Sequence, residues 1–125
     1  MRRRPVYSSV VLAALATLAC IPTRADAADL QRGALLFQSC TACHNVLGDG
    51  VGPDITGIYG QKAALRPDFK YSAALKASGL VWNEANLRAF ISNPQALVKG
   101  TLMTFPGYAA PADIDDVIAY IKTLK

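Results

Sequence analysis

Two cysteines and the single histidine of the chain lie together in the segment Cys40-Thr41-Ala42-Cys43-His44. Cysteine, two residues, cysteine and histidine form the attachment signature of c-type haem. At a helix end, Cys40 and Cys43 project from one face because side chains three residues apart lie on the same side. Their sulfurs can then reach the two vinyl groups of a porphyrin, and the imidazole of His44 can bind the iron. The spacing therefore predicts one covalently attached haem c.

Three other uses of these residues are weaker. A structural zinc site needs four cysteine or histidine ligands, and the expected mature chain offers three. A thiol–disulfide oxidoreductase also uses C-x-x-C, but it needs a βαβ context that the sequence does not suggest. Chemically silent, buried cysteines beside a capping histidine remain a third alternative.

Met103 is the candidate for the second protein ligand of the iron. It is the only methionine besides Met1 and lies 59 residues after His44, in the segment KGTLMTFPGY. Methionine more often fills gaps in a core. Here it is flanked by glycine and proline rather than placed on a helical face, and the chain has no second histidine. Histidine and methionine are a known pair of axial ligands for haem iron, so His44 and Met103 are the predicted ligands.

The N-terminus reads as a secretory signal peptide over residues 1–27, which leaves a domain at 28–125. It has a basic start, an apolar run of 12 residues and a small-x-small cleavage site, namely Arg2 to Arg4, Val10 to Ile21 and Ala25-Asp26-Ala27. An uncleaved anchor is a weaker alternative, since a spanning helix needs about 20 apolar residues. Lipidation at Cys20 is a minor alternative. The expected location is the periplasm.

Export changes the meaning of the charge. The full chain is +4, but four of its 13 basic residues and one of its nine acidic residues lie within 1–27, which leaves a net charge of about +1. No basic cluster remains, so nucleic-acid binding is not expected. The remaining 98 residues would form a marginal core without a covalent or cofactor staple, and a haem would supply one.

The remaining pattern is helical, and no alternating strand is convincing. We expect helices around Leu30 to Cys40 with Asp29 as cap, over Ser72 to Ser78, over Trp82 to Ser92 with Asn83 as cap and Pro94 as stop, and over Pro111 to Leu124. Two irregular loops, Gly48 to Gly60 and Lys99 to Tyr108, separate them. The predicted fold class is all-α.

With these elements in place, the chain resembles class I cytochrome c, the group of mitochondrial cytochrome c and bacterial cytochrome c2. The resemblance covers nearly all of Asp29 to Lys125 and rests on ordered motifs: Gly33 with Phe37, C-T-A-C-H, G-P-D-I-T-G, F-K-Y-S, L-V-W-N-E, N-P, K-G-T-L-M-T-F and I-A-Y-I-K. It implies helices wrapped around one haem, with the first and last helices crossing at Gly33 and with Phe37 and Tyr120 near the contact.

The resemblance also implies roles for further residues. The Pro53 carbonyl would accept the His44 ring N–H, which fixes its tautomer. Tyr71, Trp82 and Thr101 would hydrogen-bond the haem propionates, although core packing is the ordinary fate of such aromatic residues. Phe105 would lie beside the exposed haem edge.

Several positions depart from the family pattern. Gln61 replaces an arginine, and Leu97 and Leu75 replace a tyrosine and an asparagine near the methionine. A more apolar pocket would raise the reduction potential, while loss of the cation would lower it. The docking lysines are sparse, with Lys62, Lys70, Lys76 and Lys99 as candidates.

These observations predict a soluble periplasmic electron carrier and not an enzyme. Its haem would cycle between Fe(III) and Fe(II) in transient complexes with periplasmic or membrane-bound redox proteins, as a monomer and without a small-molecule substrate. One alternative is a dedicated cytochrome subunit of a periplasmic dehydrogenase. A ligand-binding haem sensor or peroxidase would need an open iron position and a distal acid–base group.

Overall fold

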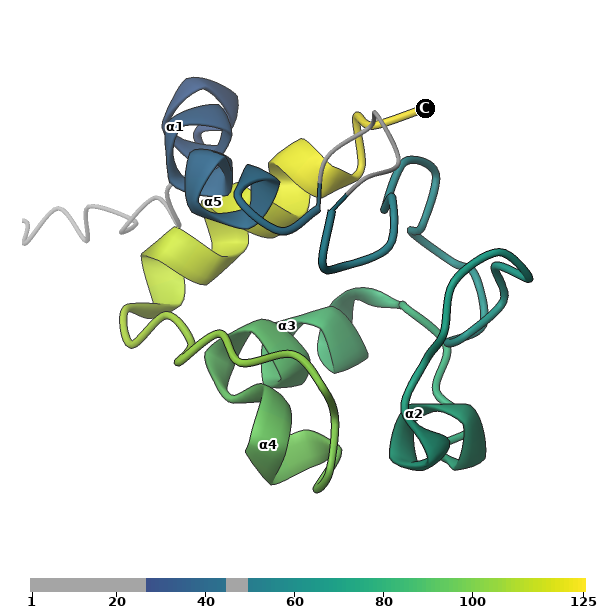
Figure 1. Ribbon diagram of the computed structural model, residues 1–125. Helices are drawn as coiled ribbons and strands as arrows, with labels where there is room; N and C mark the ends of the chain where they lie inside the picture. The colour runs from purple at the N-terminus through teal and green to yellow at the C-terminus, as the bar shows by residue number, and fades with distance from the viewer. Residues whose placement is uncertain (1–26, 45–49) are drawn as a thin grey trace, which may run out of the picture.

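The computed structural model describes residues 27–44 and 50–125, so residues 1–26 of the expected signal sequence, Cys20 among them, lie outside the described residues. The described residues form five helices in order: α1 (Leu30–Thr41), α2 (Ala73–Ala77), α3 (Glu84–Ser92), α4 (Pro94–Leu97) and α5 (Pro111–Ile121) (Figure 1). In the described ranges, β-pairing is limited to an isolated bridge between Lys62 and Val81. None of the helices in these ranges is long and apolar enough to cross a membrane. The all-α prediction is confirmed.

Helices α1 and α5 cross in close contact (Figure 1). Their approach depends on Gly33, where an added Cβ would lie only 2.1 Å from the Asp116 carbonyl oxygen. One turn further along, the rings of Phe37 and Tyr120 pack with their centroids 5.2 Å apart. Any larger residue at position 33 would separate the two backbones, which is why glycine is required here.

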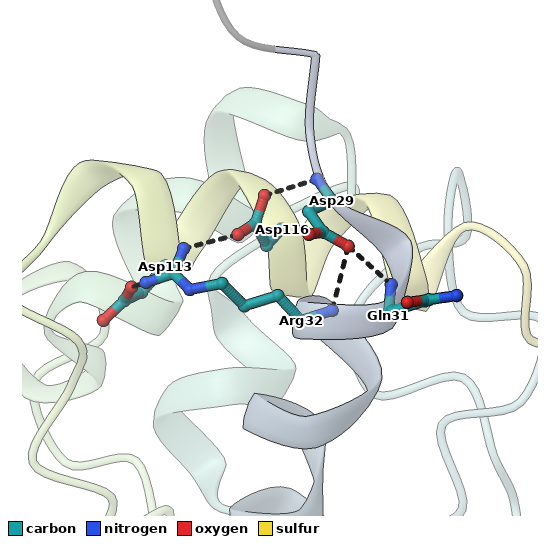
Figure 2. Close-up of polar contacts among 5 residues, drawn as sticks. All are labelled: Asp29, Gln31, Arg32, Asp113 and Asp116. Atoms are coloured by element: carbon teal, nitrogen blue, oxygen red, sulfur yellow. Dashed lines mark hydrogen bonds and ion pairs between the residues drawn. The ribbon is translucent and has the colours of Figure 1, made fainter.

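A polar cluster seals one end of this crossing (Figure 2). The Asp29 carboxylate caps α1 by accepting the backbone N–H groups of Gln31 and Arg32 at 2.9 and 3.0 Å. The Asp29 backbone N–H donates to the buried carboxylate of Asp116 at 2.7 Å. The Arg32 guanidinium pairs with Asp113 and Asp116 on α5. The cluster fixes where α1 starts on α5, and hence where its cysteine-bearing end emerges.

Two helix boundaries differ from the sequence prediction by more than one residue. Helix α3 begins at Glu84 rather than Trp82, because the Asn83 side chain accepts the Asn86 N–H and acts as the cap. Helix α5 ends at Ile121 rather than Leu124. Ser72 caps α2 as predicted, and its hydroxyl accepts the Leu75 N–H.

Pro94 ends α3 and also begins the short helix α4, which the sequence analysis did not predict. Proline is favoured at the first position of a helix because its missing N–H has no partner there in any case. Asn93 caps the new helix by accepting the Ala96 N–H at 3.0 Å. Because Pro94 is fully buried, it determines which side of α4 faces the core.

The buried core lies among α1, α3 and α5 and the chain just after α4. Its apolar members are Phe37, Trp82, Leu87, Phe90, Ile91, Val98, Ile114, Val117, Ile118 and Ile121. Helix α2 lies apart from α1 and α5, across a long irregular stretch of chain (Figure 1). The cavity described next lies between these parts.

Candidate functional site

A cavity of about 930 Å³ opens beside the core. Its volume is at the upper end of the range of about 300 to 1,000 Å³ that is typical of small-molecule and cofactor sites. All nine predicted site residues line it, although they come from five separate parts of the chain: Cys40, Cys43, His44, Pro53, Tyr71, Trp82, Thr101, Met103 and Phe105. The fold therefore brings the predicted site residues to one place.

The two cysteines lie where α1 gives way to a tight turn. The backbone N–H groups of Cys43 and His44 both donate to the Cys40 carbonyl, at 3.1 and 2.8 Å. This helical turn continues past the end of α1 at Thr41, so both thiols face the cavity. Both thiols are free and half-buried. Burial raises the pKa of the Cys40 thiol.

His44 is held by the glycine-rich loop that follows the turn. Its Nδ1 lies 2.7 Å from the Pro53 carbonyl oxygen. A carbonyl can only accept, so Nδ1 carries the proton, and Nε2 of the neutral imidazole then keeps a free lone pair. The ring also lies against Gly52, where an added Cβ would be 2.7 Å from His44 Cε1. The predicted Pro53 contact is present, whereas the close approach of Gly52 was not foreseen.

Met103 is half-buried on a cavity wall formed by the loop after α4. Its backbone N–H donates to the buried Thr101 hydroxyl at 3.3 Å. Further along this loop, the ring of Phe105 packs edge-on against Tyr108 at 5.1 Å. Tyr108 in turn donates to the Leu36 carbonyl of α1 at 2.7 Å, which ties the loop to the cysteine-bearing helix.

Arg66 is a cavity residue that the sequence analysis missed. It lies on the same cavity as Gln61, and its guanidinium donates to the Thr56 carbonyl at 3.0 Å and pairs with Asp54 at 3.3 Å. Hydrogen bonds from the Thr56 hydroxyl and backbone, with a smaller contribution from Arg66, lower the pKa of Asp54. Although Gln61 is neutral, Arg66 therefore gives the cavity a cation. In the sequence, Arg66 is only an arginine within an irregular segment, and such a segment does not predict where its side chains lie.

The expectation that Leu97 lies in the pocket near the methionine is wrong. It does not line the cavity but a separate surface depression beside Lys99, with 36% of its surface exposed. The physical reason is the new helix at Pro94, which places Leu97 one turn later on its outer side. Phe90 of α3 lines the cavity together with the other aromatic residues, and Leu75 lines it as predicted.

The candidate docking lysines are also divided by the structure. Lys62 lines the cavity, whereas Lys99 lines the separate depression near Leu97. Neither Lys70 nor Lys76 lines either hollow. The rim of the cavity instead carries exposed apolar side chains, with Val51 81% and Leu102 69% exposed.

The donor set of the cavity fits a covalently held haem. It offers two free thiols, one imidazole with a free Nε2 and one thioether, from Cys40, Cys43, His44 and Met103. Most of the remaining wall is apolar, with Phe90, Leu75 and Ile91 among its residues. The lining also includes polar hydrogen-bonding side chains, among them Gln61, Arg66 and Thr101, as a cofactor with carboxylate groups requires.

Comparisons with known proteins agree with this site. The family model described as Cytochrome c matches residues 30–125. A cytochrome c2 from Rhodomicrobium vannielii is 45% identical over 100 residues, which cover 78% of this chain and 80% of that protein. A cytochrome c-554 from Methylosinus trichosporium is 40% identical over 119 residues, which cover 92% of this chain and 90% of that protein.

The fold comparison points the same way. The structure of cytochrome cH from Methylobacterium extorquens matches with a TM-score of 0.73 and 44% sequence identity, over 76% of this chain and 98% of that one. The predicted resemblance is confirmed, as are the fold and a single covalently bound haem c with electron-transport chemistry. The chain belongs to the cytochrome c family.

Proposed function

We propose that this cytochrome c is an exported periplasmic electron carrier whose haem is held by Cys40 and Cys43 and ligated at the iron by His44 and Met103. The observation that carries the proposal is the meeting of these four side chains on one cavity, with the His44 Nδ1 already committed to Pro53. When bound, the haem supplies a one-electron Fe(III)/Fe(II) couple.

The protein's own groups set how the iron would be held. The Pro53 carbonyl fixes the ring orientation and tautomer of His44 and makes its Nε2 a stronger donor. Gly52 allows the loop to lie flat against the imidazole. The thioether of Met103 would supply a soft ligand, which raises the reduction potential relative to a second imidazole. Thr101, Tyr71 and Trp82 would supply the hydrogen bonds to the propionates.

This ligand set favours electron transfer over catalysis. If His44 and Met103 both held the iron, no iron position would remain for a substrate or a gas. His44 is also the only histidine in the chain, so no second imidazole is available as a distal acid–base group. A peroxidase or sensor function is therefore the less supported alternative. A dedicated dehydrogenase subunit would share the chemistry and would show a stable complex on size-exclusion chromatography of periplasmic extract.

Mass spectrometry of the denatured protein tests the attachment. We expect the haem mass to remain bound to the wild-type chain after denaturation, and the mature N-terminus to begin at Ala28. The Cys40→Ala and Cys43→Ala variants should each lose one thioether bond. Haem that dissociates from the denatured wild-type protein would contradict covalent attachment through these cysteines.

The pocket walls make a specific prediction about the potential. Leu75 gives the cavity an apolar wall, which favours the less charged ferrous state. A Leu75→Asn variant should lower the midpoint potential by about 40 mV, the equivalent of one hydrogen-bond-sized stabilisation of about 1 kcal/mol. Leu97→Tyr is the matched control, because Leu97 lies outside the cavity and should leave the potential unchanged. Equal shifts in both variants would contradict this assignment.

The net charge of the expected mature chain predicts how electron transfer to partner proteins depends on salt. The expected mature chain is close to neutral, and among the four candidate lysines only Lys62 lines the cavity. Electron transfer to partner proteins should therefore depend only weakly on ionic strength. A steep salt dependence would reveal a charged docking surface that these residues do not account for.

A further inference from the structure

The side chain of Gln95, on α4, reaches the backbone of the loop that carries Met103. Its Nε2 donates to the Thr101 carbonyl at 2.8 Å and to the Met103 carbonyl at 3.3 Å. Its Oε1 accepts the Gly100 N–H at 3.3 Å. One amide thus bonds to three backbone groups between Gly100 and Met103, the predicted iron ligand.

We infer that Gln95 is a positioning residue that holds Met103 on the iron. This inference rests on the ligation by Met103 proposed above. Gln95 itself does not line the cavity, so it would act through the loop backbone rather than through contact with the haem.

The chemistry of the amide suits this task. Two carbonyl oxygens need two N–H donors, and the backbone N–H of Gly100 needs an acceptor. A glutamine amide carries two N–H donors and one oxygen acceptor on a single plane. Glutamate would present a second oxygen to the two carbonyls, and alanine would leave all three backbone groups without these bonds.

Gln95 reaches out from a fixed base. Pro94, the residue before it, is fully buried, and the Asn93 side chain caps α4 through the Ala96 N–H at 3.0 Å. By contrast, the chain between Lys99 and Ala109 forms no helix. Bonding the irregular segment to a packed helix restricts the positions that Met103 can take.

The consequence is a change in how often the iron position opens. An external ligand can bind only when Met103 has left, so its apparent affinity is proportional to the fraction of open molecules. Loss of the Gln95 bonds should raise that fraction roughly tenfold, the effect of about one to two net hydrogen bonds.

The test uses the ferric holoprotein and imidazole as the probe ligand. We expect Gln95→Ala and Gln95→Glu to bind imidazole about tenfold more tightly than the wild type, and to lose the red methionine-to-iron charge-transfer band at lower pH. Leu97→Ala, on the same helix, should stay within about twofold of the wild type. Asp116→Asn, which weakens the distant α1–α5 crossing, controls for general loss of stability.

The outcomes separate the two proposals. Gln95 variants that bind imidazole like the wild type, or no more tightly than Asp116→Asn, would overturn the positioning role while leaving the Met103 ligation intact. A wild-type protein without the red band would overturn the ligation itself, and the positioning role with it.

Discussion

Replacing Gly33 with alanine tests the crossing that orients the cysteine-bearing helix. The added methyl would lie 2.1 Å from the Asp116 carbonyl oxygen and 2.8 Å from its carbonyl carbon, where ordinary contact begins near 3.4 Å. A backbone carbonyl in the middle of α5 cannot turn aside, so the helices must part by about 1.3 Å, the difference between 3.4 and 2.1 Å. The separation also strains the packing of Phe37 on Tyr120.

The expected free-energy change is the difference between two opposing effects. Alanine favours an isolated helix over glycine by about 1 kcal/mol. Overpacking of a tight interface costs about 3 kcal/mol, the upper part of its usual range, because the clash is with backbone. Gly33→Ala should therefore destabilise the protein by about 2 kcal/mol.

Urea unfolding of the holoprotein, followed by far-ultraviolet circular dichroism, measures this change. Leu35→Ala is the matched control, because Leu35 lies on the same helix with 65% of its surface exposed and should change stability by less than about 0.5 kcal/mol. A Gly33→Ala protein as stable as the wild type, or more so, would refute the close crossing and leave helix propensity as the larger effect.

Three further substitutions test the loops around the site. Tyr108→Phe removes the hydroxyl that donates to the α1 backbone and should cost about 1 kcal/mol in urea unfolding; no loss would show that the bond is replaced by water. Gly107→Ala should destabilise by more than about 2 kcal/mol, because φ is +100° and the new Cβ would lie 1.8 Å from the Ser92 carbonyl oxygen; a stable variant would contradict this tight approach. The lowered pKa of Asp54 stabilises the fold above the unfolded value of about 3.9, and this contribution disappears as the pH falls through the folded pKa. Thr56→Val should raise that pKa in a carboxyl-carbon NMR titration, and an unchanged titration would rule out the Thr56 hydroxyl as its main cause.

Local chemistry made much of the fold predictable. Ser72 and Asn83 each act through an N–H three residues away, so their capping roles can be read from sequence alone. The apolar spacing of α5 reflects burial on one face, and its residues Ile114 and Ile118 are indeed buried. The haem-attachment segment is equally local, since its geometry lies within one helical turn.

Features that depend on tertiary placement could not be predicted from the sequence. Whether Leu97 lines the cavity or the outer surface depends on how Pro94 starts a new helix against the core. The periodicity of the sequence does not determine this. Arg66 reaches the cavity from a loop without repeat or cap. Gln95 looks like any surface glutamine until the loop containing Met103 folds back over it.

The central claim is that His44 and Met103 together hold the iron of a covalently bound haem. An optical spectrum of the purified, matured protein, oxidised and reduced, with and without carbon monoxide, tests it most directly. We expect a low-spin spectrum with the weak red band of methionine bound to ferric iron and no response to carbon monoxide. A high-spin spectrum, or ready binding of carbon monoxide, would show that Met103 does not ligate the iron and would favour a ligand-binding or enzymatic role.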